Sequence, residues 1–276
     1  MYMNALQRTE LFGWEWVAES KRRLLNYLEQ HLDNSQDNLL AISTGNPEQV
    51  MLAQQDDHFF QIVRDAFDLV LPDGEGIVLA SGLLNNQTKS TKIKERLAGV
   101  EIVAELISHS NPKHGSILVI GGREYQDSKI KVNSTDYIFR AVLDSSQSVQ
   151  TSINNQELLW LPAYEDAKQP SVREEALVER TIKRLRPSLV FVALGAPQQE
   201  FWVAAHKQLL TESGTRIVMV VGGAFDMLTG KVLRAPKFLR QLKLEWFWRL
   251  LQEPSRWRRQ LVLIKFITYV FKLKFL

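Results

Sequence analysis

The sequence predicts a doubly wound α/β fold with a mostly parallel sheet, followed by a helical, basic C-terminal appendage. Short, continuous apolar runs recur along the chain, as in strands that are buried on both faces of a parallel sheet. Amphipathic segments alternate with these runs, which is the pattern of β-turn-α units. The last segment, residues 234–276, is strongly cationic. A chain of 276 residues suits one sizeable domain with an appendage.

The first half of the chain supplies two predicted strands and their helices. Residues 1–37 are polar with a helical pattern, so we expect a helical N-terminal cap. Leu39–Ser43 predicts a strand, and Pro47–Gln55 predicts a helix with proline in its first turn. Phe67–Leu71 predicts the next strand, and a helix follows it as far as about Leu84.

The second half supplies three more strands. These are Ser116–Ile120, Leu189–Leu194 and Arg216–Val221, and a helix to about Leu210 follows the second of them. Residues 123–172 carry weak and interrupted signals. We therefore expect a catalytic domain over 1–233 and an appendage over 234–276.

Polar and small residues follow every predicted strand. In doubly wound sheets, ligands bind outside the carboxyl ends of the strands, so these turns should converge on one site. The turns are Thr44-Gly45-Asn46, Asp73-Gly74, Gly121-Gly122, Gly195-Ala196-Pro197 and Gly222-Gly223.

Asp73 is the first candidate for chemistry. A carboxylate at the ligand edge of a sheet, near a helix N-terminus, suits a general base. By position alone, a helix N-cap is the more common role for such a residue. Thr44 and Asn46 also have two interpretations: they could hydrogen-bond a sugar or nucleotide, or they could cap the next helix. The glycine pairs could approach a phosphate closely, but tight turns are the more common reason for such pairs.

Several kinds of site are excluded by what the sequence lacks. There is no cysteine, which removes disulfides, thiolate nucleophiles and cysteine-bound metals. The five histidines lack paired metal-ligand spacing, and no Asp-x-Asp pair is present, so we expect no metal and no cofactor. The dinucleotide fingerprint G-x-G-x-x-G is also missing.

The C-terminal segment carries the clearest charge signal. Residues 234–276 hold eleven Lys or Arg against two acids, a charge of +9, so the remaining chain carries −6. Arg258, Lys265 and Lys272 are spaced by seven and share a helix face, with Trp and other apolar residues around them. This pattern predicts a helix that lies on an anionic membrane surface.

Other roles for this helix remain open. It could form a dimer interface, which would make a homo-oligomer, or pack on its own domain. Nucleic acid is not expected as a partner, because the acidic body offers no broad phosphate-binding face. We find no signal peptide, and no stretch approaches the roughly 20 apolar residues of a membrane span.

Eight motifs in order resemble the WecG/TagA/CpsF family of glycosyltransferases, glycosyltransferase family 26. They cover about residues 39–120 and 187–260. The motifs are Thr44-Gly45-Asn46-Pro47-Glu48, Leu71-Pro72-Asp73-Gly74, Arg96-Leu97-Ala98-Gly99, Gly121-Gly122, Leu194-Gly195-Ala196-Pro197-Gln198-Gln199-Glu200, Gly222-Gly223-Ala224-Phe225-Asp226, Arg234-Ala235-Pro236, and Leu244-Glu245-Trp246 with Glu253-Pro254.

The resemblance implies a Rossmann-like, inverting, metal-independent enzyme. It would move an N-acetylmannosamine-type sugar or another hexose from a UDP-sugar to a polyprenyl-diphosphate-linked saccharide, in surface polysaccharide biosynthesis. It would work in the cytoplasm, peripherally on the inner face of the cell membrane. Asp73 would be the catalytic base and Thr44 a second catalytic residue. The implied substrate-binding residues are Asn46, Gly74, Arg96, Gly121, Gly122, Gly195, Pro197, Gln199, Glu200, Gly222, Phe225, Asp226 and the tail residues Arg249, Arg256 and Arg259.

The chain also departs from the family pattern. Gln198 replaces a common Lys or Arg, Lys243 replaces a usual Gly, and residues 123–172 lack a usual Gly-Tyr/Phe stretch. Two alternatives therefore stay open. One is a membrane-peripheral, nucleotide-sugar-binding scaffold without activity, and the less favoured one is a nucleotide-dependent oxidoreductase.

Overall fold

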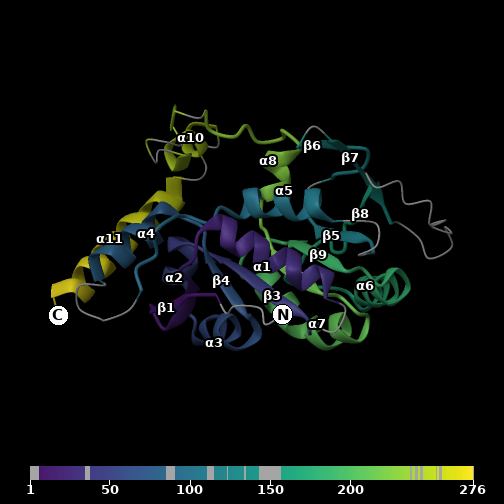
Figure 1. The fold of residues 1–276 in the computed structure, drawn as a ribbon, viewed down its shortest axis with the longest axis horizontal. Coiled ribbons are helices and arrows are strands. Elements are labelled where there is room, and N and C mark those ends of the chain that lie inside the picture. The colour runs from purple at the N-terminus through teal and green to yellow at the C-terminus, as the bar shows by residue number, and fades with distance from the viewer. Residues whose placement is uncertain are drawn as a thin grey trace.

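A computed structural model describes residues 6–34, 38–84, 91–110, 115–122, 124–133, 135–142, 157–236, 238–239, 242, 245–252, 254 and 257–275. In this part of the chain, a ten-stranded sheet has the order β1-β2-β4-β3-β10-β9-β5-β8-β7-β6. Strands from β2 to β7 in this order run parallel, and an antiparallel hairpin closes each edge. The predicted mostly parallel, doubly wound sheet is confirmed (Figure 1).

The strands follow the apolar runs of the sequence. The five that were predicted are β3 (Leu40–Gly45), β4 (Leu69–Pro72), β5 (Ile117–Gly121), β9 (Leu189–Ala193) and β10 (Ile217–Val220). All their residues are buried, as the continuous hydrophobicity requires. The others are β1 (Arg8–Leu11), β2 (Trp14–Val17), β6 (Lys129–Val132), β7 (Thr135–Ala141) and β8 (Glu157–Leu161).

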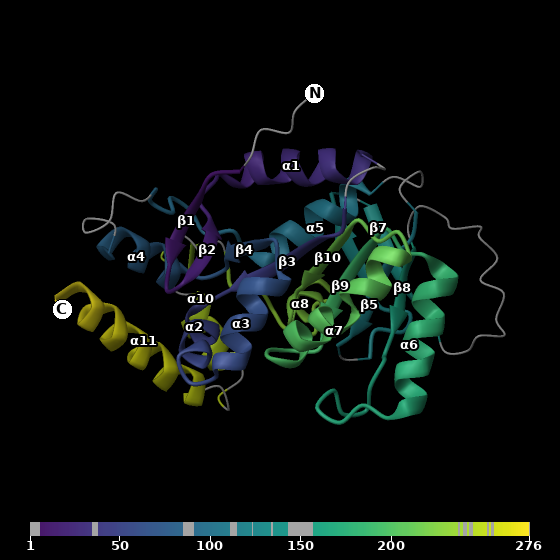
Figure 2. The same cartoon turned by 90° about the horizontal axis from the view of Figure 1, so that it is seen from below.

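Helices cover both faces of the sheet (Figures 1 and 2). One face packs against α1 (Lys21–Asp33), α5 (Gly99–His109) and α8 (Ala224–Leu228). The other packs against α3 (Asp57–Ala66), α6 (Val172–Leu185) and α7 (Gln198–Glu212). Alternate residues of each strand enter the two cores, so that Ile42 joins the first and Ala41 the second.

A third apolar cluster lies at one end of the sheet. It joins β1 and β2 to α2 (Pro47–Ala53), α4 (Glu75–Leu84) and the C-terminal helix α11 (Trp257–Phe275). Helix α10 (Glu245–Gln252) precedes α11. This cluster fixes α11 beside the helices that follow β3 and β4.

The prediction of a helical cap over residues 1–37 is wrong for residues 8–17. Here β1 and β2 form a hairpin, and only Lys21–Asp33 of this region is helical. Phe12 and Gly13 form its two-residue turn, and both have positive φ, as such hairpins require. The alternation of exposed and buried residues has the period of a strand, and Trp14 and Trp16 are among the buried residues. Residues 1–5 and 35–37 lie outside the described part.

The weakly patterned region 123–172 supplies the other sheet edge. Strand β8 pairs with β5, β7 pairs with β8, and β6 returns antiparallel to β7. Exposed and buried residues alternate in β6, because only one face of this strand is covered. Such a strand has a weaker hydrophobic signal in the sequence than the central strands, which are apolar throughout.

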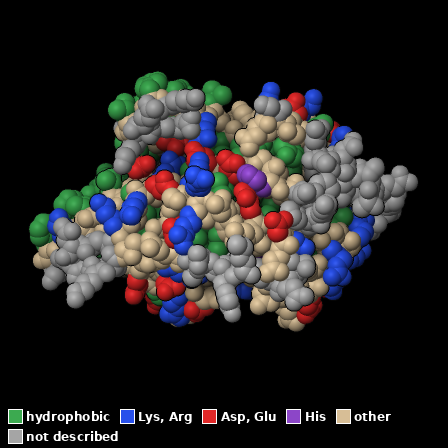
Figure 3. Space-filling view, viewed as in Figure 1, with side chains coloured by type: hydrophobic (Ala, Val, Ile, Leu, Met, Phe, Trp, Pro, Cys, Tyr) green, Lys and Arg blue, Asp and Glu red, His purple; other side chains and the backbone are tan. Residues whose placement is uncertain are grey.

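The predicted C-terminal helix is confirmed, and it packs on its own domain. Phe266 and Val270 of α11 are buried against α2 and α4, and the Phe266 ring lies 5.5 Å from that of Phe12. The opposite face remains exposed and apolar along the left edge of the molecule in Figure 3. Its exposed apolar residues are Leu261, Ile264, Ile267, Phe271 and Phe275.

Lysines lie at the border of this apolar face. Lys265 and Lys272 are exposed, and helical geometry puts them on the side of α11 that also carries Leu261. Apolar side chains are exposed on α10 as well, at Trp246, Phe247 and Leu251. Among the helices that the structure describes, none is both long enough and apolar enough to cross a bilayer.

Candidate active site

A cavity of about 820 Å³ lies at the carboxyl ends of four neighbouring strands. The turns after β3, β4, β9 and β10 line it, and these strands are adjacent in the sheet. The strand order reverses here, because β4 lies on one side of β3 and the late strand β10 on the other, which is the usual ligand position in doubly wound sheets. Helices α2, α4, α10 and α11 contribute most of the remaining walls, and α5, α7 and α8 add one or two residues each.

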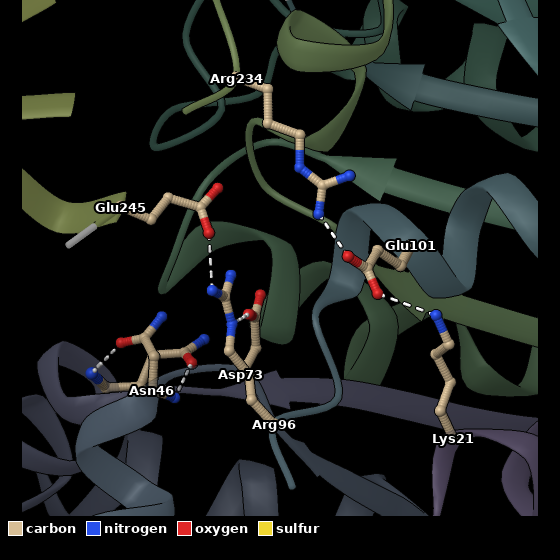
Figure 4. A network of polar contacts seen from close by, with 8 residues as sticks. Lys21, Asn46, Asp73, Arg96, Glu101, Arg234 and Glu245 are labelled. Atoms are coloured by element: carbon tan, nitrogen blue, oxygen red, sulfur yellow. Dashed lines mark hydrogen bonds and ion pairs between the residues drawn. The ribbon is translucent and has the colours of Figure 1, made fainter. Parts of the chain in front are cut away.

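Asp73 and Arg96 form an ion pair in this cavity. Nε of Arg96 donates to Oδ1 of Asp73 at 3.3 Å. Nη1 of the same guanidinium donates to Oε2 of Glu245, the first residue of α10, at 2.6 Å (Figure 4). Burial alone would lower the pKa of Arg96, but the two carboxylates raise it well above its usual value, so the guanidinium remains charged.

The cap interpretation of Asp73 is not supported by this arrangement. Helix α4 begins at Glu75, so Gly74 occupies the position before its first residue. The carboxylate of Asp73 faces Arg96 in the cavity. Its backbone N–H donates to Gly45 O at 2.8 Å, which fixes the turn after β4 to the end of β3.

Thr44 lies beside Asp73 at the end of β3. Its Oγ1 donates to the carbonyl oxygen of Val220 at 3.3 Å, and the side chain is buried. A Cβ added at Gly99 would lie 3.1 Å from Thr44 Cγ2 and 3.2 Å from Asp73 Oδ2. Glycine at the start of α5 therefore gives the two candidate catalytic side chains the room they occupy.

Two glutamines, Gln49 and Gln199, also line the cavity, and both contact a buried acid, Glu200. Oε1 of Glu200 accepts from Nε2 of Gln49 at 2.8 Å and from Nε2 of Gln199 at 2.9 Å. Both glutamines line the cavity, but Glu200 does not. Burial raises the pKa of Glu200 to about 7, although its two amide donors act in the opposite direction.

The walls change character from one end of the cavity to the other. Polar and charged groups gather near the strand ends, at Thr44, Asp73, Arg96, Gln199 and Glu245. The part between α4 and α11 is apolar. Its lining side chains include Leu52, Leu79, Leu83, Leu263, Phe266, Ile267 and Phe271.

Eight of the predicted site residues line this cavity. They are Thr44, Asn46, Asp73, Gly74, Arg96, Gly195, Gln199 and Gly222. Gly195 and Gly222 have φ of +79° and +49°, a backbone conformation that favours glycine and turns the chain sharply after β9 and β10. Asn46 also caps α2, since its side chain accepts from the Gln49 N–H at 3.1 Å, so cap and cavity positions coincide.

The other predicted residues that the structure describes do not line the cavity. Pro197 precedes α7, and Gly121 and Gly122 follow β5. Gly122 makes room for the ring of Tyr125, which would lie 2.4 Å from an added Cβ. Phe225 is fully buried in the core, and Asp226 accepts from the Tyr125 hydroxyl at 2.8 Å. The structure thus gives these residues internal contacts.

The tail reaches the cavity through residues that the sequence analysis did not assign to the site. Glu245, Trp246 and Phe266 line it. The predicted residue Arg256 and the side chains of Arg249 and Arg259 lie outside the described part of the chain. The motif Leu244-Glu245-Trp246 was the sequence signal that could have indicated these site residues. No local pattern, however, predicts that Glu245 contacts Arg96, which is 149 positions away.

A second ion-pair network holds the beginning of the C-terminal segment. Arg234 donates to Glu101 Oε1 of α5 at 2.5 Å, and Lys21 of α1 donates to Oε2 at 3.0 Å (Figure 4). Although burial raises it, the pKa of Glu101 is lowered overall by these two cations. Within the described residues, no three His, Asp or Glu side chains cluster as metal ligands do.

Known proteins resemble this chain over almost its whole length. The profile of the WecG/TagA/CpsF family of glycosyl transferases matches residues 9–276. An N-acetylglucosaminyldiphosphoundecaprenol N-acetyl-beta-D-mannosaminyltransferase of Bacillus subtilis (strain 168) is 30% identical over 267 residues, covering 97% of this chain and 92% of the relative.

Two further relatives carry the same enzyme name. The one from Bacillus spizizenii (strain ATCC 23059 / NRRL B-14472 / W23) is 30% identical over 231 residues, covering 84% of this chain and 78% of the relative. The one from Staphylococcus aureus (strain MW2) is 24% identical over 252 residues, covering 91% and 86%.

Proposed function

Because the chain belongs to the WecG/TagA/CpsF family of glycosyltransferases, we propose that it transfers a sugar to a saccharide carried on a polyprenyl diphosphate. The donor is a UDP-sugar, of the N-acetylmannosamine type or another hexose. The names of the relatives support the lipid-linked acceptor. Membership of a glycosyltransferase family favours this function over an oxidoreductase.

The two-ended cavity carries the proposal. Its polar end suits a sugar diphosphate, and its apolar end, between Leu79 of α4 and Ile267 of α11, suits the first isoprene units of the acceptor. An amphiphilic acceptor would lie with its hydroxyl near Asp73 and its chain directed along α11. The donor would then lie against the glycine turns at Gly195 and Gly222.

The proposed reaction is a single displacement with inversion. Asp73 accepts the proton of the acceptor hydroxyl while that oxygen forms a bond to the anomeric carbon of the donor. The bond from this carbon to the diphosphate breaks, and its electron pair leaves with UDP. Arg96 orients the Asp73 carboxylate before the reaction through the hydrogen bond from its Nε.

Backbone N–H groups near the glycine turns after β9 and β10, other than that of Gly222, which donates to Gln199, stabilise the leaving diphosphate, together with Arg249, Arg256 and Arg259 of the tail. The arginines supply positive charge and the neutral N–H groups donate hydrogen bonds, which together take the place of a metal ion. The ion pair of Arg96 with Glu245 supports the idea that the tail completes the site.

The enzyme works on the cytoplasmic membrane face, where residues 234–276 rest on anionic lipid. Two observations support this placement. The exposed face of α11 is apolar and bordered by Lys265 and Lys272, which is typical of interfacial helices. The apolar end of the cavity is lined by the same helix, so a lipid-anchored acceptor would enter from the bilayer side.

A panel of UDP-sugars with a polyprenyl-diphosphate-GlcNAc acceptor tests the proposal. We expect UDP release and acceptor elongation with an N-acetylmannosamine-type donor or another hexose. If no donor supports transfer by folded protein, the proposed activity is wrong and an inactive scaffold remains.

A further inference from the structure

Glu200 is fully buried, yet it lies next to two residues of the cavity wall. It belongs to the first turn of α7, and its side chain turns into the protein. Oε1 accepts both amide hydrogen bonds, from Gln49 and Gln199. Within the described part of the chain, the buried Oε2 has no hydrogen-bond partner. Such an asymmetric, buried acid is costly and needs an explanation.

The two glutamines are fixed at their other ends as well. Oε1 of Gln49 accepts from the backbone N–H of Asn46 at 3.1 Å. Oε1 of Gln199 accepts from the backbone N–H of Gly222 at 3.0 Å. A continuous chain of hydrogen bonds therefore joins the turns after β3, β9 and β10 through Glu200.

This chain determines which way each amide points. Backbone N–H groups can only donate, so the amide oxygens must face Asn46 and Gly222. The amide nitrogens then face Glu200. Each nitrogen carries two hydrogens, and only one is used by Glu200. The second hydrogens of Gln49 and Gln199 remain for a ligand in the cavity that both residues line.

We propose that Glu200 is a positioning residue, which holds Gln49 and Gln199 as N–H donors toward oxygen atoms of the nucleotide-sugar donor. The inference rests on the proposed function, because it assigns a ligand of the same cavity. It gives Glu200 no direct contact with the ligand, in contrast to the role that the family resemblance implied.

Two substitutions separate positioning from general destabilisation. Glu200→Gln keeps an oxygen at Oε1 and places an amide where Oε2 has no partner, so both glutamines keep their acceptor. Glu200→Leu removes the acceptor and lets both amides rotate. Gln208→Leu is the matched control on the same helix, because Gln208 is exposed and contacts Glu212 instead.

The measurements are the dissociation constant of UDP by calorimetry and KM for the sugar donor in full-length protein. We expect Glu200→Leu to raise both by about tenfold, as for the loss of one hydrogen bond to a charged ligand. Glu200→Gln and Gln208→Leu should stay within about threefold of wild type. In a Gln199→Leu background, Glu200→Leu should have a smaller effect, since one of its two targets is gone.

Equal UDP affinity of wild type and folded Glu200→Leu would overturn the inference and leave the proposed transfer intact. Failure of the wild type to transfer any sugar, with UDP affinity still dependent on Glu200, would overturn the transfer only. A loss of affinity in Glu200→Gln as large as in Glu200→Leu would also contradict positioning, because it would point to the charge itself.

Discussion

Arg96 and Glu245 form an ion pair of 2.6 Å, although 149 positions separate them. Arg96 precedes α5, while Glu245 opens α10 in the cationic C-terminal segment. The same guanidinium reaches Asp73 at 3.3 Å. The segment that we expect to meet the membrane is therefore linked to Asp73, the candidate base, through the side chain of Arg96. The residue of this cationic segment that makes the link is an acid, Glu245.

Removing this acid should loosen the C-terminal segment. Glu245→Ala leaves the half-buried Arg96 without its nearer partner, so we expect a loss of about 1–3 kcal/mol in unfolding free energy, less than for a fully buried pair. Urea denaturation measures the loss, and hydrogen exchange should quicken in α10.

Asp65→Ala is the control, since it breaks an exposed, solvent-screened pair with Arg64 and should leave the unfolding free energy almost unchanged. Equal effects of the two substitutions would show that Glu245 does not hold the segment.

The central fold and the location of the site follow from sequence because burial has a local pattern. Strands such as Leu189–Ala193 are buried on both faces, so they are apolar throughout, and their carboxyl ends must meet at one edge. The sequence therefore predicts that Thr44, Asp73, Gly195 and Gly222 lie at one site, and all four line the cavity.

The remaining features depend on contacts between distant segments. Gln49 meets Glu200 across 151 positions, and no local pattern encodes that contact. Gly122 and Asp226 have motif positions that suggest ligand binding, but Tyr125, from the weakly patterned region, contacts both. The hairpin at 8–17 was missed although Trp14 and Trp16 alternate with polar residues at strand period.

Gly99 should be required for the geometry of the catalytic pair. In Gly99→Ala, the new methyl group would lie 3.1 Å from Thr44 and 3.2 Å from Asp73, so one of them must move. We expect kcat to fall about tenfold or more, because small displacements of catalytic groups are costly.

Gly82→Ala provides the comparison, since its closest neighbour is the flexible end of Lys92 at 3.1 Å. Its kcat should remain near the wild-type value. Unchanged kcat in Gly99→Ala would mean that the spacing between Thr44 and Asp73 is not needed for turnover.

Stability should depend on pH through Glu200. Its pKa is about 7 when folded and near the ordinary 4.5 when unfolded, so the folded state binds the extra proton. The stability that this proton provides is complete below about pH 4.5 and is lost as pH rises to 7.

Glu200→Gln has no proton to lose. The wild type loses stability as the pH rises and this variant does not. The difference in unfolding free energy between them should therefore shift in favour of the variant by about 2–3 kcal/mol from pH 4.5 to pH 8. Parallel stability curves for the two proteins from urea unfolding would contradict the assignment.

The exposed apolar face of α11 should bind membranes. Changing Ile264 and Phe271 together to Asp should weaken binding to vesicles that contain anionic phosphatidylglycerol by at least about tenfold. The reason is that burial of each apolar side chain in the bilayer contributes roughly 1.5–3 kcal/mol to the binding free energy.

Val172→Asp is the control, because this exposed side chain lies on α6. Vesicle sedimentation compares the variants. If all of them bind alike, α11 does not form the docking surface.

The most direct test of the account is the rate of sugar transfer by Asp73→Asn. The amide is nearly the same size but cannot take the acceptor proton. With the active UDP-sugar and a polyprenyl-diphosphate-GlcNAc acceptor, we expect kcat to fall about 10²–10⁴-fold while KM and thermal stability change little. A folded Asp73→Asn protein that turns over at the wild-type rate would show that Asp73 is not the base.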